Sequence, residues 1–433
     1  MANLEKLKLF ILEMEAEHKS AVYGRNGKSK VRIPNLEEDN QVLIQAYKST
    51  NEEVKSKGNI IPAAEWLLDN FYVIEEQFKE IQYTVKKDFY NRLPVLVEGK
   101  YSAYHRIYGI AAGMVDHLDG QVDEESLMRF LKLYQEHIHL TSKELWVFPI
   151  MLRICLLERI KDIALYISDT IKLRTLADQW AVKLVQSLAV TREEPNSKDE
   201  FRKSIQEHES KIGVMKPAYA ERLLHRLREE GGDVAPIIRW VDGKLAIYRS
   251  SAEDIVHEEH QKQVNYQNSI GNAITSLRVI NGLNWEEIFE ELSLLNQILS
   301  QDPAEIYPLM DFCSRDSYRK KVEALAEKHG IDEIKVAVKA IECARENKDN
   351  DLNKYNHVGY YIVDEGLGQL VDKLGGRRRK INGRSLSSTL YFGSIGILTL
   401  GLWFAFLVGT WTTSKSLGLG GLLLSAVVSF LPI

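Results

Sequence analysis

Apolar residues recur every three or four positions along most of the chain, which is the spacing of α-helices that bury one face. The longest continuous core signal lies between His105 and Ile160. Its first helix carries one apolar stripe, made of Leu127, Phe130, Leu131, Tyr134 and Ile138. A nearly uncharged run follows from Trp146 to Leu157, broken only by Arg153, and we predict a core helix because this run is too short to cross a bilayer.

Local signals predict where these helices begin and end. Asp123 is a helix cap by residue type, and Thr141 with Glu144 three residues on has the spacing of a capping box that begins the second helix. Pro149 lies inside that helix and lacks a backbone N–H, so we expect it to kink the helix or to break it at about Phe148.

Further helices are predicted on both sides of this stretch. Residues 4–18 form a short amphipathic helix, and one long helix runs from Pro62 to about Phe89. After the core stretch the helical spacing continues as far as Leu188. A polar segment at residues 193–200 then ends it, and we place a boundary there.

The second half of the soluble part is also predicted to be helical. Asn284 is a predicted cap, and the helix that it begins is expected to end at Asp302-Pro303. Ser314 is predicted to cap the next helix, and residues 332–345 form another. The basic residues expected to be exposed on the helix after Ser314 are Arg315, Arg319, Lys320 and Lys321. Asp242-Gly243 is a weak signal for a short β-hairpin.

Composition narrows the class of protein. With 433 residues, 45% of them hydrophobic and 27% charged, the chain can bury substantial cores. A net charge of −5 argues against nucleic acid as a main partner, since a phosphate backbone calls for a basic face. Cys155, Cys313 and Cys343 lie far apart in apolar helical contexts and are interpreted as buried thiols in a reducing compartment. The charged amino terminus predicts no signal peptide.

The carboxyl-terminal part has a membrane pattern. Residues 390–411 carry no charge and, as a helix, are about 33 Å long, enough to cross a bilayer core of roughly 30 Å. Residues 417–433 begin a second span of about 25 Å, and its end at this depth predicts a truncated chain, because a carboxylate in hydrocarbon is costly. The positive-inside rule places the preceding region, from residue 1 to about residue 384, in the cytoplasm.

A basic segment precedes the first predicted span. It consists of Arg377, Arg378, Arg379, Lys380 and Arg384. We expect these residues to set the membrane topology and to contact anionic lipid headgroups, with binding of a nucleotide diphosphate as the alternative.

These patterns together predict an all-α protein, a multi-helix cytoplasmic region followed by a transmembrane helical hairpin. The predicted parts are an N-terminal helical subdomain at 1–195, a second helical subdomain at 196–376, and a basic juxtamembrane segment with two transmembrane helices, the second one truncated, at 377–433.

Four sequence blocks carry a family resemblance. They are WLLDNFYVIEEQ with YNRLPVL, then RIYGIAAGMVDHLDGQVDEESL with YQEHIHLTSKELWVFPIMLR, then NSIGNAITSLRVINGLNWEEIFEELS with DPAEIYPLMDFCSRDSYRKKVE, and HVGYYIVDEG. In order and spacing the chain, from about residue 60 to 433, resembles the amino-terminal region of the cyclic β-1,2-glucan synthases, membrane proteins that join a family 84 glycosyltransferase to a cellobiose-phosphorylase-like domain.

The resemblance implies that a glucosyltransferase domain follows the predicted spans in the same polypeptide. That domain would use UDP-glucose and a divalent metal, and this chain would then have no cofactor of its own. The membrane, the downstream transferase domain and the glucan are the partners that the resemblance implies.

Candidate metal sites in the chain fail on spacing or context. Asp349-Asn350-Asp351 has the DxD spelling, but it lies in a polar linker with no strand before it. His137 and His139 are two residues apart, so on a helix they point to nearly opposite faces. His257 and His260 are better spaced but lack an evident third ligand. We predict no metal site here.

Two further motifs also fall short. Residues 116–123 resemble a calcium loop, but aligning Gly120 with the loop glycine leaves Val115 and Ser126 where carboxylates belong. Arg239-Trp240 resembles part of an acceptor-binding QxxRW motif, but Pro236 stands at the glutamine position, and we predict that Trp240 packs in the core. No catalytic residue is predicted.

Tyrosines near turns are the remaining candidates for ligand contact. We select Tyr101, Tyr104, Tyr360 and Tyr361 as possible glucan contacts by ring stacking, with ordinary packing as the alternative. Two rivals to the synthase-region hypothesis stay open. One is a stand-alone membrane-anchored scaffold or glucan-binding protein that acts with a synthase in trans. The other is a helical sugar-binding or hydrolytic (α/α) barrel, which is disfavoured because no carboxylate pair stands out in suitable loops.

Overall fold

The computed structural model describes residues 2–23, 31–57, 61–85, 89–90, 93–193, 198–230, 234–246, 252–347, 353–375 and 399. Within these residues the protein is all-α, as predicted, and its one sheet pairs the two-residue strands β1 (Val22–Tyr23) and β2 (Pro94–Val95) in antiparallel register. Both predicted spans, at 390–411 and 417–433, and the basic segment at 377–384 lie outside this description, Thr399 apart. None of the helices described here combines the length and the hydropathy that a membrane crossing requires.

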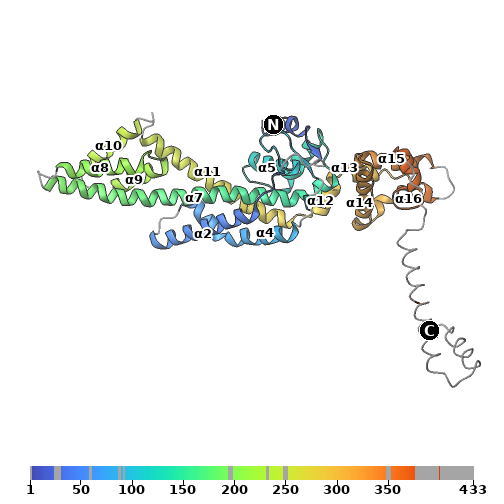
Figure 1. The fold of residues 1–433 in the computed structure, drawn as a ribbon, viewed down its shortest axis with the longest axis horizontal. Helices are drawn as coiled ribbons and strands as arrows, with labels where there is room; N and C mark the ends of the chain where they lie inside the picture. Colours follow the sequence, from blue (N-terminus) through green and yellow to red (C-terminus); the bar gives the residue numbers. More distant parts are fainter. Residues whose placement is uncertain are drawn as a thin grey trace, which may run out of the picture.

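A single helix, α7 (Ser142–Glu193), is the spine of the molecule. It has 52 residues and is therefore about 78 Å long. The predicted capping box begins it: the Thr141 backbone N–H donates to Glu144 Oε2 at 3.0 Å, and the Glu144 N–H donates to Thr141 Oγ1 at 3.2 Å. Figure 1 shows helices packed along both sides of α7.

Of the two outcomes predicted at Pro149, the break is wrong, because α7 continues through this residue, and the kink stays a prediction. Proline removes one backbone hydrogen bond, but Phe148, Met151 and Leu152 on the surrounding turns are all at most 1% exposed. Burial of these side chains outweighs one lost hydrogen bond, since each fully buried large apolar side chain contributes roughly 1.5–3 kcal/mol.

The first half of α7 lies in the largest hydrophobic cluster, which we call the central core. Its other helices are α1 (Ala2–His18), α2 (Leu36–Lys57), α3 (Pro62–Asp69), α4 (Phe71–Thr84), α5 (Arg106–His117), α6 (Glu124–Gln135), the second half of α11 (Ala252–Gly282) and α12 (Trp285–Leu292). The predicted caps of α6 and α12 are confirmed: Asp123 accepts from the Ser126 N–H and Asn284 from the Glu287 N–H.

The single helix predicted from Pro62 to Phe89 is instead two helices, α3 and α4, and the second ends at Thr84. The break is at Asn70, whose side chain donates to the Trp66 carbonyl at 2.9 Å. Such a side-chain bond competes with the helical backbone ladder. The apolar spacing continues across the break because both helices bury the same side.

The second half of α7 forms a separate cluster, the distal core, with α8 (Lys198–Ile212), α9 (Pro217–Glu229), α10 (Ala235–Ala246) and the start of α11. The hairpin predicted at Asp242-Gly243 is wrong, since both residues lie inside α10. Ile237, Val241 and Leu245 lie four residues apart and are at most 1% exposed, so packing of one helical stripe overrode the local turn signal.

The C-terminal core lies at the other end of the molecule (Figure 1). It contains α13 (Leu294–Leu299), the 3₁₀ turn η2 (Tyr307–Leu309), α14 (Phe312–His329), α15 (Glu333–Glu346), the 3₁₀ turn η3 (Asn353–Tyr355), α16 (Val358–Val363) and α17 (Leu367–Lys373). The helix predicted at 332–345 is confirmed as α15. The helix that Asn284 begins stops at Leu292 rather than at Asp302, because Ser293 caps a new helix.

Three details of α14 differ from the prediction. The cap is Asp311, which accepts from the Ser314 N–H, so the helix begins earlier than expected. Arg319 is 1% exposed rather than on the surface, whereas Lys320 and Lys321 are exposed as predicted. The prediction of a buried thiol is wrong for Cys313, which is exposed in the first turn of α14, and is confirmed for Cys155 and Cys343. The division of the chain at residue 195 stays a prediction.

Candidate functional site

The described structure places two of the four candidate tyrosines in one cluster with carboxylates. This tyrosine–carboxylate cluster consists of Tyr101, Tyr104, Tyr108, Asp116 and Glu158. Tyr101 and Tyr104 lie on the turn between β2 and α5, Tyr108 and Asp116 lie on α5, and Glu158 lies on α7. The turn therefore brings aromatic side chains against two helices of the central core.

The three rings pack on one another. The rings of Tyr104 and Tyr108 are stacked, with centroids 4.5 Å apart and an interplanar angle of 17°. Tyr101 meets Tyr108 edge-on at 6.0 Å and 83°. Tyr108 is 7% exposed, whereas Tyr101 and Tyr104 are only partly buried. The cluster thus presents the outer tyrosines to solvent on a rigid aromatic support.

Each carboxylate accepts a hydrogen bond from a tyrosine hydroxyl. Tyr108 donates to Glu158 Oε2 at 2.8 Å, and Tyr101 donates to Asp116 Oδ2 at 2.9 Å. Lys100 Nζ lies 2.6 Å from the same Asp116 oxygen and 4.9 Å from the centre of the Tyr101 ring. Hydrogen bonds of this kind fix the rotation of the rings.

The turn that carries Tyr101 and Tyr104 is held by main-chain bonds. Ala103 has a φ of 71°, in the left-handed region that non-glycine residues rarely adopt. Its N–H donates to the Leu96 carbonyl at 2.8 Å, and its carbonyl accepts from the Arg32 N–H at 2.8 Å. These two bonds keep the unusual conformation in place, and with it the direction of the flanking tyrosines.

Burial sets the protonation of the groups in this cluster. It raises the pKa of the Glu158 carboxyl, although the hydrogen bond from Tyr108 lowers it, and the Asp39 and Asp162 carboxylates raise it further. Burial also raises the pKa of Tyr101 to about 12. Burial raises the pKa of Tyr108 as well, so Tyr101 and Tyr108 stay neutral hydroxyls at physiological pH. The cluster can therefore exchange hydrogen bonds with hydroxyl groups and stack on an apolar ring face.

The other two candidate tyrosines lie in the C-terminal core, away from this cluster. Tyr360 is 9% exposed and Tyr361 is fully buried. The Tyr361 hydroxyl accepts from Asn347 Nδ2 at 2.8 Å and donates to the Tyr355 carbonyl at 3.0 Å. In this conformation these rings pack in the core, and a glucan contact through them stays a prediction.

Sequence reasoning missed a polar network in the C-terminal core. Asp302, interpreted only as a helix end, lies 2.7 Å through Oδ2 from His357 Nδ1 and accepts from the Val358 N–H at 2.8 Å. His357 Nε2 lies 3.3 Å from the Tyr318 hydroxyl. Burial opposes ionisation of Asp302, but the hydrogen bonds from His357, Val358 and Tyr307 outweigh it and lower the pKa of this carboxyl.

This network joins two of the blocks that carry the family resemblance. Asp302 and Tyr318 belong to the block that begins DPAEIY, and His357 begins HVGYYIVDEG. A Cβ at Gly359 would come within 2.4 Å of His357 Nε2, so the imidazole of His357 already fills the space beside Gly359. The network therefore holds the loop after α13 against the start of α16.

The buried Arg319 joins the central core to the C-terminal core. Its guanidinium lies between the rings of Phe289 and Phe312, 5.0 and 5.1 Å from their centres, and Nη1 donates to Asn296 Oδ1 at 3.2 Å. Trp146 stacks on Phe289 with centroids 4.6 Å apart. Cation–π contacts replace part of the hydration that a buried guanidinium loses.

The remaining candidate residues make ordinary contacts. His257 Nε2 lies 2.9 Å from Gln261 Nε2, and His260 Nε2 lies 3.8 Å from Glu221 Oε1. In the part of the chain that the structure describes, no group of three or more metal-ligating side chains is arranged to hold an ion. Asp349-Asn350-Asp351 lies outside that part.

Asp116 and Asp123, at the ends of the supposed calcium loop, face separate partners, Lys100 and Ser126. Trp240 packs against the distal core, as predicted, and donates through Nε1 to Glu209 Oε1 at 3.1 Å.

Fold and site together define a class: an all-helical protein built on one long spine, with a tyrosine–carboxylate cluster on its central core. Sequence comparison adds a particular relative. Over 344 residues, 78% of this chain, it is 30% identical to the cyclic β-(1,2)-glucan synthase NdvB of Rhizobium meliloti (strain 1021). No protein-family model matches the chain.

The resemblance to the cyclic β-1,2-glucan synthases is therefore confirmed. The match covers 12% of the length of NdvB, so this chain is similar to one region of that protein.

Proposed function

We propose that this chain is the non-catalytic anchoring and platform region of a membrane glucosyltransferase that makes cyclic β-1,2-glucan from UDP-glucose. The similarity to NdvB over 344 residues carries the proposal. In this proposal the transferase domain follows the chain in the same polypeptide and supplies the sites for UDP-glucose and a divalent metal. The described helices lie on the cytoplasmic side of a bacterial inner membrane.

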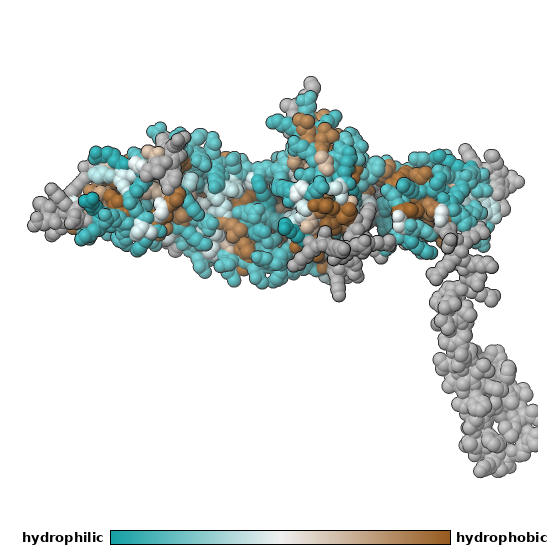
Figure 2. Space-filling view, turned by 45° about the horizontal axis from the view of Figure 1, so that its top comes forward, coloured by the Kyte–Doolittle hydropathy of each residue, from teal (hydrophilic) through white to brown (hydrophobic). Residues whose placement is uncertain are grey.

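The shape of the described part supports a platform role. A spine of about 78 Å offers a long surface, and the central and distal cores keep that surface rigid along its length. Figure 2 shows this surface to be mainly hydrophilic, with separate hydrophobic areas over the three parts. In the proposal, the transferase domain packs on some of these areas.

The anchoring part of the proposal rests on the sequence after the C-terminal core. An uncharged stretch at 390–411 and a second apolar stretch at 417–433 form the proposed hairpin, and the basic residues 377–384 contact lipid headgroups. A protein that carries these segments is expected to float with liposomes in a density gradient. A protein ending at Gly375 is expected to stay at the bottom.

The proposal is tested by glucose transfer. The purified 433-residue chain, supplied with UDP-[¹⁴C]glucose and Mg²⁺ or Mn²⁺, is expected to incorporate no label into glucan. Incorporation above that of a heat-treated sample would contradict the non-catalytic role. The platform role predicts that co-expression of this chain with a synthase lacking the corresponding region restores glucan production, and failure of that restoration would contradict it.

A second function is favoured by the tyrosine–carboxylate cluster. Partly exposed rings backed by a rigid aromatic support, next to carboxylates, suit the binding of a glucan, whose ring faces stack and whose hydroxyls donate hydrogen bonds. In this second hypothesis, the protein is a membrane-anchored glucan-binding scaffold that acts with a synthase in trans.

Replacing a ring at the surface separates the two functions. Tyr104→Ala is expected to weaken binding of β-1,2-glucan roughly three- to tenfold, because one aromatic contact contributes about 0.5–1.5 kcal/mol. Tyr83→Ala, at a tyrosine that is 82% exposed on α4, is the control and is expected to bind as wild type does. Equal affinities of wild type, Tyr104→Ala and Tyr83→Ala for β-1,2-glucan would contradict glucan binding at this cluster.

A further inference from the structure

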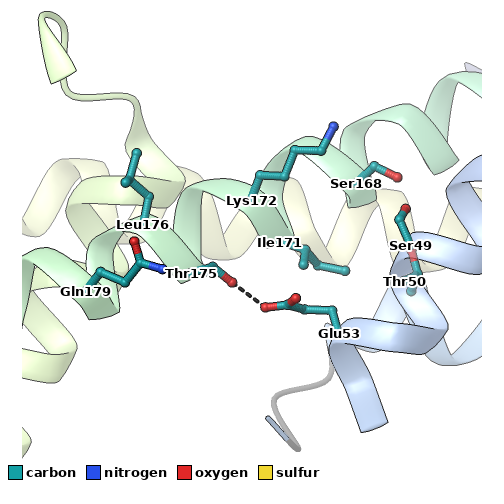
Figure 3. Close-up of a pocket in the computed structure, with 9 residues that line it drawn as sticks. All are labelled: Ser49, Thr50, Glu53, Ser168, Ile171, Lys172, Thr175, Leu176 and Gln179. Carbon is teal, nitrogen blue, oxygen red and sulfur yellow. Dashed lines mark hydrogen bonds between the residues drawn. The ribbon is translucent and has the colours of Figure 1, made fainter. Parts of the chain in front are cut away.

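A pocket lies between the C-terminal half of α2 and the middle of α7 and shares no residue with the tyrosine–carboxylate cluster. Its volume is about 310 Å³, at the small end of the range for ligand sites. The lining residues are Ser49, Thr50, Glu53, Ser168, Ile171, Lys172, Thr175, Leu176 and Gln179. Figure 3 shows the serine and threonine side chains of both helices turned toward the space between them.

Two hydroxyl groups on the pocket wall lack hydrogen-bond partners. Thr50 is fully buried and Ser168 is 8% exposed, yet neither Thr50 Oγ1 nor Ser168 Oγ bonds to any described residue. A buried hydroxyl left without a partner costs roughly 1–3 kcal/mol. Such groups are rare in folded proteins unless a ligand or a water molecule satisfies them.

The rest of the lining is polar but balanced in charge. Glu53 accepts a hydrogen bond from the Thr175 hydroxyl, as the dashed line in Figure 3 marks. The lining carries one carboxylate, on Glu53, and one ammonium group, on Lys172, and Gln179 adds an amide. The Lys172 Nζ lies 3.9 Å from Asp169 Oδ1. Ile171 supplies an apolar wall that is 9% exposed. A strongly charged ligand would leave one of the two ionic groups opposed by like charge.

We propose that this pocket binds an uncharged, polyhydroxylated molecule of monosaccharide to disaccharide size. Its hydroxyls exchange hydrogen bonds with Thr50 and Ser168 and donate to Glu53, and an apolar face of the molecule contacts Ile171. The inference goes beyond the proposed anchoring role, because it concerns a different place in the fold and a binding event rather than glucose transfer.

The test is direct binding to the full chain. The purified 433-residue protein, held in a detergent without a sugar headgroup, is titrated with D-glucose, with sophorose and with glucose 6-phosphate. Saturation-transfer NMR detects weak binding of such probes. We expect saturable binding of glucose or sophorose, with glucose 6-phosphate bound more weakly because its charge is unmatched in the pocket.

Two substitutions locate the site. Thr50→Val and Ser168→Ala each remove one unpartnered hydroxyl, and each is expected to weaken saccharide binding roughly tenfold. Both variants are expected to melt at or above the wild-type temperature, since without a ligand neither hydroxyl makes a hydrogen bond that stabilises the folded protein. Ser187→Ala is the matched control on α7, because the Ser187 hydroxyl is satisfied by the Leu184 carbonyl at 2.9 Å.

Three results would overturn the inference. One is the absence of binding by either saccharide together with a melting temperature of both variants below that of wild type. That result would mean that the two hydroxyls bind only structural water. Another is binding that Thr50→Val and Ser168→Ala leave unchanged. The third is tighter binding of glucose 6-phosphate than of glucose, which would mark an anion site. None of these results depends on whether the chain transfers glucose.

Discussion

At the scale of single residues, a partly buried carboxyl group at the start of α15 makes a pH-dependent contact with the start of α7. Glu333 Oε1 accepts from the Ser142 N–H at 2.8 Å and from the Ser142 hydroxyl at 3.1 Å. Burial raises the pKa of Glu333 to about 7, against the lowering effect of the Ser142 N–H, and the nearby Glu323 carboxylate adds to the rise.

The sign of the pH effect follows from this shift. A carboxyl whose pKa is higher in the folded than in the unfolded state binds more protons when folded. Its contribution to the free energy of unfolding is therefore constant below the unfolded value of 4.5, falls as the pH rises from 4.5 to about 7, and is constant again above that.

Glu333→Gln removes this titration and keeps an acceptor for Ser142. The free energy of unfolding of the variant is expected to exceed that of wild type by an amount that grows between pH 4.5 and 7 and reaches on the order of 2–3 kcal/mol at pH 8. Thermal unfolding of wild type and Glu333→Gln between pH 4.5 and 8 measures this difference in the free energy of unfolding. Glu75→Gln, at an exposed carboxylate of α4, is the control, and a difference independent of pH for Glu333→Gln would contradict the assignment.

At the scale of secondary-structure elements, helix starts were the best predicted features. Asp123, Asn284 and the Thr141–Glu144 pair all cap helices as expected, because a cap depends on residues within one turn of each other. The continuity of helices was predicted less well. Pro149 and Gly243 are local breaking signals, but packing of the surrounding apolar stripe keeps α7 and α10 helical.

Gly243 allows a test of this override. It lies inside α10, and a Cβ added there meets no atom within 4 Å. Gly243→Ala is expected to raise the free energy of unfolding by about 0.5–1 kcal/mol, since alanine favours a helix over glycine by this amount. In a hairpin turn with positive φ, the same change would destabilise the protein.

Gly330 is the matched control for this substitution. It ends α14 with a φ of 67°, so Gly330→Ala is expected to lower the melting temperature. A lower melting temperature for Gly243→Ala as well would show that residue 243 does not lie in a helix in solution.

At the scale of the whole molecule, the distal, central and C-terminal cores follow one another, and α7 runs through the first two (Figure 1). The α7 helix enters the central core up to Ile171 and the distal core from Ala177, so the two clusters share a helix but no buried side chain. Cores arranged in this way are expected to unfold locally before the molecule unfolds as a whole.

Leu184→Ala tests this arrangement, because Leu184 is fully buried in the distal core. The cavity is expected to lower the free energy of unfolding of the distal core by about 2–5 kcal/mol and to leave the other two cores unchanged. Hydrogen exchange should therefore speed up in α8, α9 and α10 and stay unchanged in α5. Val182→Ala, at a side chain that is 40% exposed, is the control. Faster exchange in all three cores would show one cooperative unit.

Of the candidate site, the sequence indicated the aromatic half. Tyr101 and Tyr104 were selected because they flank a turn, and the structure places them on one. Their polar partners, Asp116 and Glu158, were not selected, because 15 residues separate Tyr101 from Asp116 and 50 separate Tyr108 from Glu158. The position of Tyr361 in the C-terminal core was equally hidden from a local pattern.

The amino-acid sequence by itself determined that this protein is all-helical, where several of its helices begin, and which synthases it resembles, because these properties depend on residue types and short spacings. Only the tertiary structure decided that α7 is continuous, that Arg319 is buried, and that Glu333 binds Ser142 across 191 residues. Such contacts depend on how helices pack in space, and the energy of burying a shared apolar face outweighs the local preference of any one residue.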